Sequence, residues 1–386
     1  MKIASICLTG PFTEGYAYQD NLINKYFAIM GHDCTIIAND KIYKKGNIEK
    51  VDTGEKIIDN NIKLIRLRNK DNMPEKFVEK FRMYEGLYES LETIKPDLIF
   101  VHGLQFLDIK HIVRYKKKYK NVKIVVDNHA DFSNSATNFL SKNILHKVIW
   151  KRCAKLIEPY TNKFYGVLPA RVNFLHDIYG IESNKIELLV MGADTNEIKF
   201  NQQEKIRKDI CDRYNLNYDD FILITGGKID KSKKEVLNLM KSIKKYDINN
   251  IKLLVFGSVD SQLEGEFNSL VDNDKIKYIG WLNSNDVYDY FLASNLGVFP
   301  GRHSVLWEQA VGSGLPCVFK RWDGTEHIDL DGNCKFLQDG TEEEILEVIQ
   351  SIVYNQDIYK KMKDISVSKG INYFSYEKIS IRSIDI

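Results

Sequence analysis

The stretch from Leu296 to Phe319 constrains the fold of this chain most strongly. It reads LGVFPGRHSVLWEQAVGSGLPCVF. Its pattern predicts a buried strand over 296–299, a tight turn, a short helix that begins at Ser304, a glycine-containing stop and a second buried strand over 315–319. A strand, turn, helix and strand in this order are typical of α/β proteins, so we expect that fold class.

The start of the predicted helix has the composition of a ligand site. Ser304 is a good N-cap, and the backbone N–H groups that follow it would point toward an anion at the edge of the sheet. Glu308 lies one turn further along the same face, where a carboxylate can accept two hydrogen bonds from a vicinal diol such as a ribose. An anion site beside a diol site predicts a nucleotide. The alternative is that Glu308 only complements the helix dipole.

The same stretch resembles the donor-binding signature of retaining GT-B glycosyltransferases, above all of glycosyltransferase family 4. The family's Glu-Ala-Met-Ala-x-Gly-x-Pro-Val-like run stands here as residues 308–318. The resemblance implies that Glu308 binds the donor ribose, and that the turn residues His303, Ser304 and Val305 contact the donor. The family also places a first glutamate eight residues earlier, where this chain has Pro300 in a shorter turn. We therefore carry over the second glutamate of the motif but not the first, which in the family contacts the donor sugar.

Length and composition place few restrictions on the chain. Its 386 residues suffice for two domains, and a net charge of +2 predicts no general attraction to nucleic acid. The six cysteines are scattered without metal spacing, so we expect reduced, buried thiols. The first residues form too short an apolar run for a signal peptide, and no window has the ~18 apolar residues of a membrane span. We therefore expect a cytoplasmic protein.

The beginning of the chain predicts a βαβ unit. Lys2–Thr9 reads as a strand, an amphipathic helix extends to Met30, and Cys34–Ala38 reads as the next strand. Ligands bind beyond the carboxyl ends of parallel strands, so the loop after the first strand belongs to the functional edge. We assign Thr13 and Glu14 in this loop to the acceptor, and Gly15 to the donor. An ordinary solvated connector is the alternative.

Two later strands end in a histidine. Leu98–Val101 leads to His102, and Lys123–Val126 leads through Asp127 to His129, with Asp131 just beyond. The glycosyltransferase family carries a similar pair, and its second histidine touches the donor sugar. The resemblance therefore implies a catalytic role for His129, and we place His102 and Asp131 near the acceptor. A packed core residue is the alternative for His102.

A lysine-rich loop follows the strand predicted over Phe221–Thr225. Gly226 and Gly227 would form a turn, and ammonium groups from Lys228 and Lys233 would neutralise a diphosphate as the sugar departs. This loop is similar to the family's Gly-Arg-Leu-x-x-x-Lys-Gly motif, with a solvated charge run as the alternative. Further contacts to the donor are expected after the next strands, at Gly257, Trp281 and Leu282.

The motifs follow the family's order along nearly the whole chain. The resemblance implies two Rossmann-like, doubly wound domains that face a cleft, with a C-terminal helix that crosses back to the first domain. Residues 1–195 and about 368–386 would bind the acceptor, and residues 196–367 would bind the nucleotide sugar. The implied reaction transfers a sugar from a nucleotide-diphosphate sugar, most simply a UDP-sugar, to a hydroxyl group, with retention of configuration. Cell-surface polysaccharide or glycoconjugate synthesis is the expected setting, with a glycan or lipid-linked acceptor. The catalytic residues would be His129, Lys228, Lys233 and Glu308.

No Asp-x-Asp motif stands at a strand end, so we expect no metal and no other cofactor. The basic, amphipathic segments 107–119 and 139–160 predict peripheral contact with an anionic membrane at the inner face of the plasma membrane, with solvated helices as the alternative. Two other functions stay open: a nucleotide-sugar 2-epimerase of the same fold, and a non-catalytic partner subunit that lacks the first glutamate. A dehydrogenase is disfavoured because no G-x-G-x-x-G follows the first strand.

Overall fold

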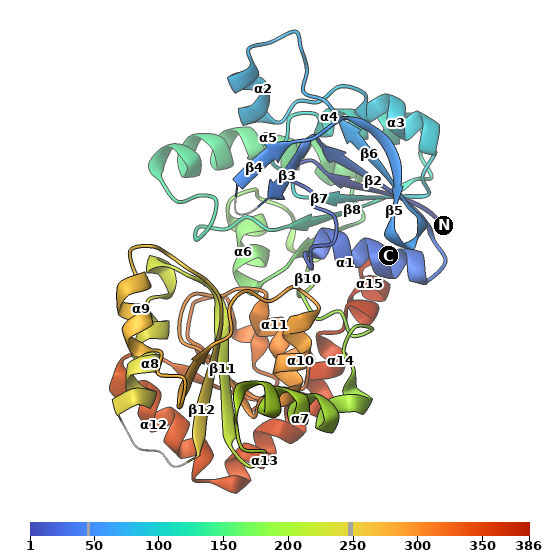
Figure 1. The fold of residues 1–386 in the computed structure, drawn as a ribbon. Coiled ribbons are helices and arrows are strands. Elements are labelled where there is room, and N and C mark those ends of the chain that lie inside the picture. Colours follow the sequence, from blue (N-terminus) through green and yellow to red (C-terminus); the bar gives the residue numbers. More distant parts are fainter. Residues whose placement is uncertain (45–46, 246–249) are drawn as a thin grey trace. The chain divides into compact units, whose positions relative to one another are not determined.

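The computed structural model describes residues 1–44, 47–245 and 250–386, and the chain divides into two compact units (Figure 1). Unit 1 comprises Met1–Val190 and Ile379–Ile386, and unit 2 comprises Met191–Lys378. Each unit is built around its own mainly parallel sheet, so the predicted α/β class with two Rossmann-like domains is confirmed.

The unit boundaries differ from those expected at 195 and about 368. Phe374 explains both differences, because its carbonyl oxygen accepts a hydrogen bond of 2.7 Å from the backbone N–H of Ala193. A Cβ atom added at Gly312 would lie 2.8 Å from the Cβ of Ala193 and 3.2 Å from the Cβ of Phe374. The two segments thus pack on the same helix of unit 2 and stay with it.

The sheet of unit 1 has the order β10-β9-β8-β7-β1-β2-β6-β5, with only β5 antiparallel to its neighbour. β3 and β4 form a separate antiparallel hairpin. The strands of unit 1 are β1 (Lys2–Cys7), β2 (Asp33–Asn39), β3 (Lys41–Lys44), β4 (Asn47–Lys50), β5 (Gly54–Ile58), β6 (Ile62–Leu67), β7 (Leu98–His102), β8 (Lys123–Asn128), β9 (Lys163–Gly166) and β10 (Ile186–Leu188).

The helices of unit 1 connect these strands, and one hydrophobic cluster packs between them and the sheet. The α-helices are α1 (Gln19–Ile29), α2 (Glu75–Phe81), α3 (Leu87–Ile94), α4 (Ile109–Lys118), α5 (Lys151–Ile157) and α6 (Pro169–Asp177). The π-helix η2 (Ser141–Trp150) runs directly into α5, and short 3₁₀ turns are η1 (Asp59–Asn61), η3 (Glu158–Tyr160) and η4 (Ser183–Lys185).

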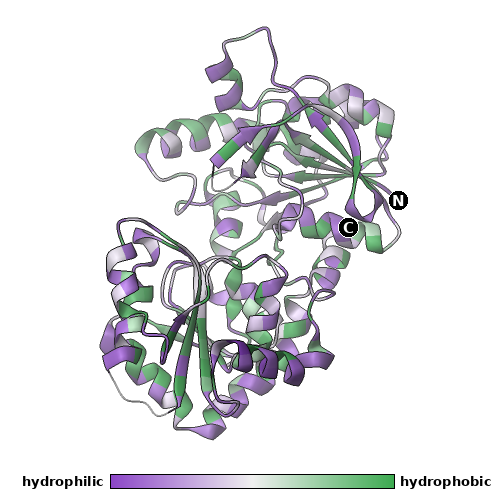
Figure 2. Ribbon diagram, in the orientation of Figure 1, coloured by the Kyte–Doolittle hydropathy of each residue, from purple (hydrophilic) through white to green (hydrophobic). Residues whose placement is uncertain are grey.

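The sheet of unit 2 is parallel throughout, in the order β13-β12-β11-β14-β15-β16. Counted within the unit, this is the 3-2-1-4-5-6 order of dinucleotide-binding folds. Its strands are β11 (Phe221–Ile229), β12 (Ile251–Val259), β13 (Ile276–Tyr278), β14 (Leu296–Phe299), β15 (Cys317–Lys320) and β16 (Cys334–Leu337). Figure 2 shows the strands of both sheets as mostly hydrophobic, as expected when helices cover both faces.

The helices of unit 2 cover its sheet on both sides; in Figure 1, α8 and α9 lie on one side of β11 and β12, and α10 and α11 on the other. The α-helices are α7 (Gln203–Tyr214), α8 (Glu235–Lys245), α9 (Glu264–Leu270), α10 (Asp286–Ala293), α11 (Leu306–Gly312), α12 (Glu342–Val353), α13 (Gln356–Ile365), α14 (Ile371–Tyr373) and α15 (Tyr376–Ile384), the last of which continues into unit 1. Shorter turns are η5 (Phe200–Gln202), η6 (Lys231–Lys233), η7 (Glu326–Ile328) and the π-helical η8 (Ser366–Gly370).

Each sheet has a point at which the strand order reverses. In unit 1 this point lies between β1 and β7, and in unit 2 it lies between β11 and β14. Open α/β sheets bind ligands in the crevice beyond the carboxyl ends of the strands at such a point. The predicted site residues lie at the carboxyl ends of these four strands or of β8, β12 and β13 in the same sheets, so topology places them at the expected edges.

Two predicted helices differ from those observed. The apolar residues Phe77, Phe81, Leu87 and Leu91 predict one helix over Met73–Thr93. The chain there is broken into α2 and α3, because Arg82 (φ 53°) and Gly86 (φ 88°) adopt left-handed backbone conformations. The helix expected over Phe139–Tyr160 is a π-helix followed by one α-helical segment and a 3₁₀ turn.

All six cysteines are buried and unpaired, as predicted. Within the described ranges, no helix combines the length and the apolar character needed to cross a membrane.

Candidate functional site

The turn between β14 and α11 is the centre of the candidate site in unit 2. The helix begins at Leu306 after an N-cap at Val305, whose backbone is already helical, and no side chain caps it. The predicted N-cap at Ser304 is therefore wrong. The carbonyl oxygen of Ser304 accepts a hydrogen bond of 3.0 Å from the N–H of Trp307, and its buried hydroxyl group has no partner in the described structure.

Glu308 is fully buried in the first turn of α11. Its Oε1 accepts hydrogen bonds of 2.9 Å from Nε2 of His303 and from Nε2 of His327, whereas Oε2 is buried without a partner in the described residues. Burial alone would raise the pKa of Glu308, but the two histidines lower it to about 2. The carboxylate is thus ionised, with one oxygen doubly hydrogen-bonded and the other buried without a partner in the described residues.

The β11 strand corrects a second prediction. Gly226 and Gly227 do not form a turn, because β11 continues to Ile229 and Gly227 pairs with Gly257 of β12. A Cβ atom at Gly257 would lie only 1.9 Å from the carbonyl oxygen of Gly227, and both residues have φ near 110°. Glycine at both positions allows the two strands to approach and continue.

Lys233 is the lysine that lies beside the turn of the site. A Cβ atom at Gly301 would lie 2.9 Å from the Cα of Lys233, and a Cβ atom at Gly227 would lie 3.3 Å from its ammonium nitrogen. Burial and the nearby Arg302 lower the pKa of Lys233, whereas Asp230 raises it. Two cationic groups, Lys233 and Arg302, therefore come together at this turn. Arg302 is a residue that the sequence-based assignment missed, although it lies within the turn that we singled out.

Lys228 lies apart from that pair. It belongs to β11, its side chain is 73% exposed, and its ammonium nitrogen lies 3.7 Å from Oδ2 of Asp230. The structure therefore brings Lys233, and not Lys228, to the turn, and a catalytic role for Lys228 stays a prediction.

The loop predicted to contact the base follows β13 at the same edge of the sheet. The N–H of Gly257 donates a hydrogen bond of 2.8 Å to the carbonyl oxygen of Gly280, which links the ends of β12 and β13. Trp281 is 71% exposed and Leu282 is half-buried. An exposed indole at this edge can stack on a base, so contact with the donor at Trp281 and Leu282 stays a prediction that the geometry allows.

In unit 1 the central group is Asp127, which the sequence-based assignment did not include. It is buried at the end of β8, and its Oδ2 lies 2.9 Å from Nδ1 of His102 and 3.2 Å from Nε2 of His129. Gln19 donates to the same oxygen through Nε2 at 3.3 Å. Burial alone would raise the pKa of Asp127, but the two histidines hold it well below its usual range. The Asp-x-His spacing after a buried strand was the available sequence signal.

The cluster around Asp127 leaves several polar atoms unsatisfied. Oδ1 of Asp127, Nε2 of His102 and Oε1 of Gln19 are buried without a partner in the described residues. His102 is almost fully buried, but the side chain of His129 is 40% exposed. The structure thus places His129 as the accessible member of the cluster and His102 as an internal one.

The loop after β1 holds its own residues in place. The hydroxyl oxygen of Thr13 accepts a hydrogen bond of 2.8 Å from the N–H of Tyr43, and Glu14 forms ion pairs with Lys56 (2.7 Å) and Arg66 (3.3 Å). Gly15 has φ of 75°, and among the described residues other than its chain neighbours no atom lies within 4 Å of the position that a Cβ atom would take there. Thr13 and Glu14 therefore stabilise the loop, and Gly15 is the open position; acceptor binding by the first two stays a prediction.

Asp131 is also engaged within its loop. Its carboxylate accepts hydrogen bonds from Nε of Arg171 (3.0 Å) and from the N–H groups of Ser133 (2.6 Å) and Asn134 (3.1 Å). These bonds, with burial opposing them, lower the pKa of Asp131. These contacts are typical of a side chain that stabilises its own loop. Acceptor binding by Asp131 stays a prediction.

Two clusters of described residues have the composition of a metal site: His102, Asp127 and His129, and His303, Glu308 and His327. Their nitrogen–oxygen distances of 2.9 to 3.2 Å suit direct hydrogen bonds. A metal-bound histidine normally donates its other N–H to a second partner, but Nε2 of His102 and Nδ1 of His327 have none in the described structure. Both clusters therefore suit direct hydrogen bonds, and the expected absence of a metal stays a prediction.

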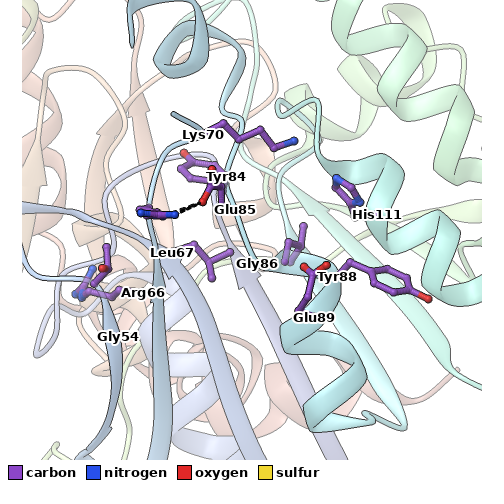
Figure 3. Close-up of a pocket in the computed structure, with 13 residues that line it drawn as sticks. Gly54, Arg66, Leu67, Lys70, Tyr84, Glu85, Gly86, Tyr88, Glu89 and His111 are labelled. Atoms are coloured by element: carbon purple, nitrogen blue, oxygen red, sulfur yellow. Dashed lines mark hydrogen bonds and ion pairs between the residues drawn. The ribbon is translucent and has the colours of Figure 1, made fainter. Parts of the chain in front are cut away.

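A cavity of about 530 Å³ lies elsewhere in unit 1 and contains none of the predicted site residues (Figure 3). Its lining includes Arg66, Arg68, Lys70, Glu85 and His111. The charges in it are largely paired, because Arg68 lies 2.6 Å from Glu85 and Lys70 lies 2.9 Å from Asp108. Nδ1 of His111 is buried without a partner in the described residues, but the carboxylates of Asp127 and Glu308 lie at the edges of the two sheets and outside this cavity.

The comparisons with known proteins agree with this geometry. Residues 206–367 match the family model described as glycosyl transferases group 1. No curated protein sequence matches the chain. Among solved structures, sucrose-phosphate synthase (tll1590) from Thermosynechococcus elongatus has a TM-score of 0.68 at 12% identity and covers 99% of this chain and 96% of its own. A glycosyltransferase from Rickettsia africae ESF-5 has a TM-score of 0.68 at 15% identity, with coverage of 100% and 97%. Anabaena Alr3699/HepE in complex with UDP has a TM-score of 0.68 at 12% identity, with coverage of 99% and 98%.

These likenesses define the fold of the protein. The structural similarity extends over nearly the whole chain and establishes the GT-B fold, with two Rossmann-like domains. The family match covers most of unit 2, including Lys233, the turn after β14 and Glu308. The predicted resemblance to GT-B glycosyltransferases is therefore confirmed.

Proposed function

We propose that this protein is a glycosyltransferase that moves a sugar from a nucleotide-diphosphate sugar to a hydroxyl group of a glycan, lipid-linked or other acceptor. The observation that carries the proposal is the arrangement at one turn of unit 2. Lys233 and Arg302 come together there, and Glu308 lies ionised one helical turn away. Adjacent cations suit a diphosphate, and a carboxylate oxygen without a partner suits a ribose hydroxyl. The family match over the same segment supports this function.

In the proposed reaction the bond between the anomeric carbon and the diphosphate oxygen breaks, and a bond to the acceptor oxygen forms. Lys233 and Arg302 would stabilise the negative charge that develops on the diphosphate. The departing diphosphate would take the acceptor proton, and the sugar would keep its anomeric configuration. His129 would orient the sugar and stabilise positive charge at its anomeric carbon. The HepE structures were solved with UDP and with UDP-glucose, which supports UDP as the first nucleotide to test.

Binding of the nucleotide is tested first, by thermal unfolding with UDP, ADP, GDP and UDP-sugars. A ligand at about 100 times its dissociation constant adds ~2.7 kcal/mol of stability. We expect one nucleoside diphosphate to stabilise the wild type, and Lys233→Gln to weaken that effect. The exposed neighbour Lys231, changed to Gln, is the matched control and should behave as wild type. Failure of every nucleotide to bind would overturn the proposal and favour a non-catalytic subunit.

Measurements of turnover then distinguish a glycosyltransferase from a nucleotide-sugar 2-epimerase. A glycosyltransferase releases UDP at an appreciable rate only when an acceptor is present, and NMR of the product should show a retained anomeric configuration. Fast UDP release without acceptor, together with a 2-epimeric sugar, would instead identify an epimerase. An inverted product would leave the transferase proposal standing but remove the proposed mechanism.

A further inference from the structure

The segment 132–157 of unit 1 has an unusual charge pattern. It contains five lysine or arginine residues and no aspartate or glutamate, although the whole chain is nearly balanced, with 55 basic and 53 acidic residues. The basic residues are Lys142, Lys147, Lys151, Arg152 and Lys155. Lys155 pairs with Glu158 just beyond the segment. The remaining charges form a positively charged region on η2 and the start of α5.

The same segment exposes large apolar side chains. Phe139 is 78% exposed, Leu140 50%, Ile144 45% and Val148 44%. The last three are spaced four residues apart, which places them along one face of the helix. Figure 2 shows this helix with hydrophobic and hydrophilic residues interspersed. His146 and Trp150 are buried and anchor the opposite face. The apolar row is therefore held outward by the packing of the helix, and is not a disordered loop.

Helix α4 provides an internal comparison. It is also strongly basic, and the sequence pattern does not distinguish the two segments. However, its apolar residues Ile109, Ile112, Val113 and Tyr115 are all buried against the core of unit 1. Helix α4 is thus a solvated basic helix, whereas η2 combines basic residues with exposed apolar ones.

We propose that the surface formed by Phe139, Leu140, Ile144 and Val148, together with Lys142, Lys147, Lys151 and Arg152, docks on an anionic lipid bilayer. We call it the η2 surface. Apolar side chains of such a helix enter the boundary between headgroups and acyl chains, while lysine and arginine stems lie along them and place their charges at the headgroups. The absence of any acidic residue in 132–157 removes the repulsion that anionic lipids would otherwise meet. This inference does not depend on the proposed enzymatic function, because its test needs no turnover.

The test is sedimentation of the full chain with vesicles of phosphatidylcholine, with or without phosphatidylglycerol. We expect binding only to the vesicles that contain phosphatidylglycerol, weakened but not abolished by salt, because salt screens charges and leaves apolar insertion intact. The double variant Lys147→Gln/Arg152→Gln should bind about 25-fold more weakly, at about fivefold per charge. The double variant Phe139→Ser/Ile144→Ser should lose the binding that persists at high salt.

The control is a charge-matched pair on α4, Lys110→Gln/Lys117→Gln, both of which are exposed. It should stay within about twofold of wild type, because charges on a face without apolar contact lie further from the headgroups. All six changed residues are exposed, so unchanged urea unfolding should show that each variant is folded. The proposal is overturned if the wild type does not bind phosphatidylglycerol vesicles, or if the α4 control loses as much binding as the η2 pair. It is also overturned if the apolar variant changes only self-association in sedimentation velocity and binds lipid as wild type does.

Discussion

Unit 1 and unit 2 each place a buried carboxylate at the carboxyl-terminal edge of a parallel sheet and hold one of its oxygens with two imidazoles. In unit 1 the carboxylate is Asp127, next to His102 and His129. In unit 2 it is Glu308, between His303 and His327. In both, the second carboxylate oxygen is buried without a partner in the described residues. The two arrangements differ in exposure, because only the unit 1 cluster has a side chain that reaches the surface.

In unit 1 the accessible group is an imidazole, since the side chain of His129 is 40% exposed. In unit 2 both imidazoles are enclosed, with side-chain exposures of 10% for His303 and 1% for His327. A carboxylate behind an exposed histidine fixes the orientation of the ring, here through Nε2 of His129, which lies 3.2 Å from Oδ2 of Asp127. In unit 2 the two enclosed histidines instead hold the carboxylate of Glu308 in place. The same three-residue arrangement can therefore serve a reacting sugar in one unit and a nucleotide in the other.

The largest expected effect is on turnover, when His129, the exposed residue of the Asp127 cluster in unit 1, is substituted. His129→Ala should lower kcat by roughly 100-fold or more, as for the loss of one preorganised polar group, and leave the affinity for UDP nearly unchanged. His102→Ala should do much less, because His102 is internal. Steady-state kinetics and calorimetric titration with UDP measure both quantities. Normal turnover in the His129 variant would remove the proposed difference between the two units.

The second prediction concerns the acid stability of unit 2. The pKa of Glu308 is about 2 in the folded chain, below its ordinary value of 4.5, so the ionised form favours folding. This contribution is fully present above about pH 4.5 and is lost as the pH falls toward about 2. Glu308→Gln should therefore cost about 3 kcal/mol at neutral pH, and the difference from wild type should shrink in acid.

Urea unfolding followed by tryptophan fluorescence measures this difference, because Trp281, Trp307 and Trp322 all lie in unit 2. The curves of wild type and Glu308→Gln should converge as the pH decreases. Parallel curves at all pH values would show that the two histidines do not hold Glu308 ionised.

The third prediction is that Glu308, and not Asp127, binds the ribose of the nucleotide. Glu308→Ala should weaken nucleoside diphosphate binding by about 1.5 to 3 kcal/mol, the value of a hydrogen bond to a charged group, or about 10- to 150-fold. The loss should disappear for a nucleotide without the ribose 2′- and 3′-hydroxyls. Asp127→Ala is the matched control in unit 1 and should leave the affinity unchanged. Equal losses for both nucleotides would refute ribose binding by Glu308.

The smallest expected effect concerns metal ions. Because both clusters suit direct hydrogen bonds, and because Lys233 and Arg302 supply positive charge, EDTA should change turnover little. Activity assays with EDTA, and then with added magnesium or manganese, test this. Complete loss with EDTA and recovery with a divalent ion would mean that one of the two clusters, or the bound diphosphate, holds a metal.

Much of the architecture could be predicted because its signals are local. The apolar runs at Leu296–Phe299 and Leu98–Val101 predict buried strands, which the structure has as β14 and β7. The order of such segments predicted the two parallel sheets. Glu308 and Lys233 were found because each lies within a motif of a few residues.

Only the tertiary structure decided which distant groups meet. His327 reaches Glu308 across 19 residues, and Asp127 lies 25 residues from His102, because parallel strands bring their ends to one edge whatever the length of the connection. The direction of a side chain is likewise set by packing. The basic segments of α4 and η2 are similar in sequence pattern, yet the core buries the apolar face of one and leaves that of the other exposed. Local sequence determined the elements, and sheet register and packing determined the sites, since no short stretch of sequence contains the neighbours that a side chain meets in the folded protein.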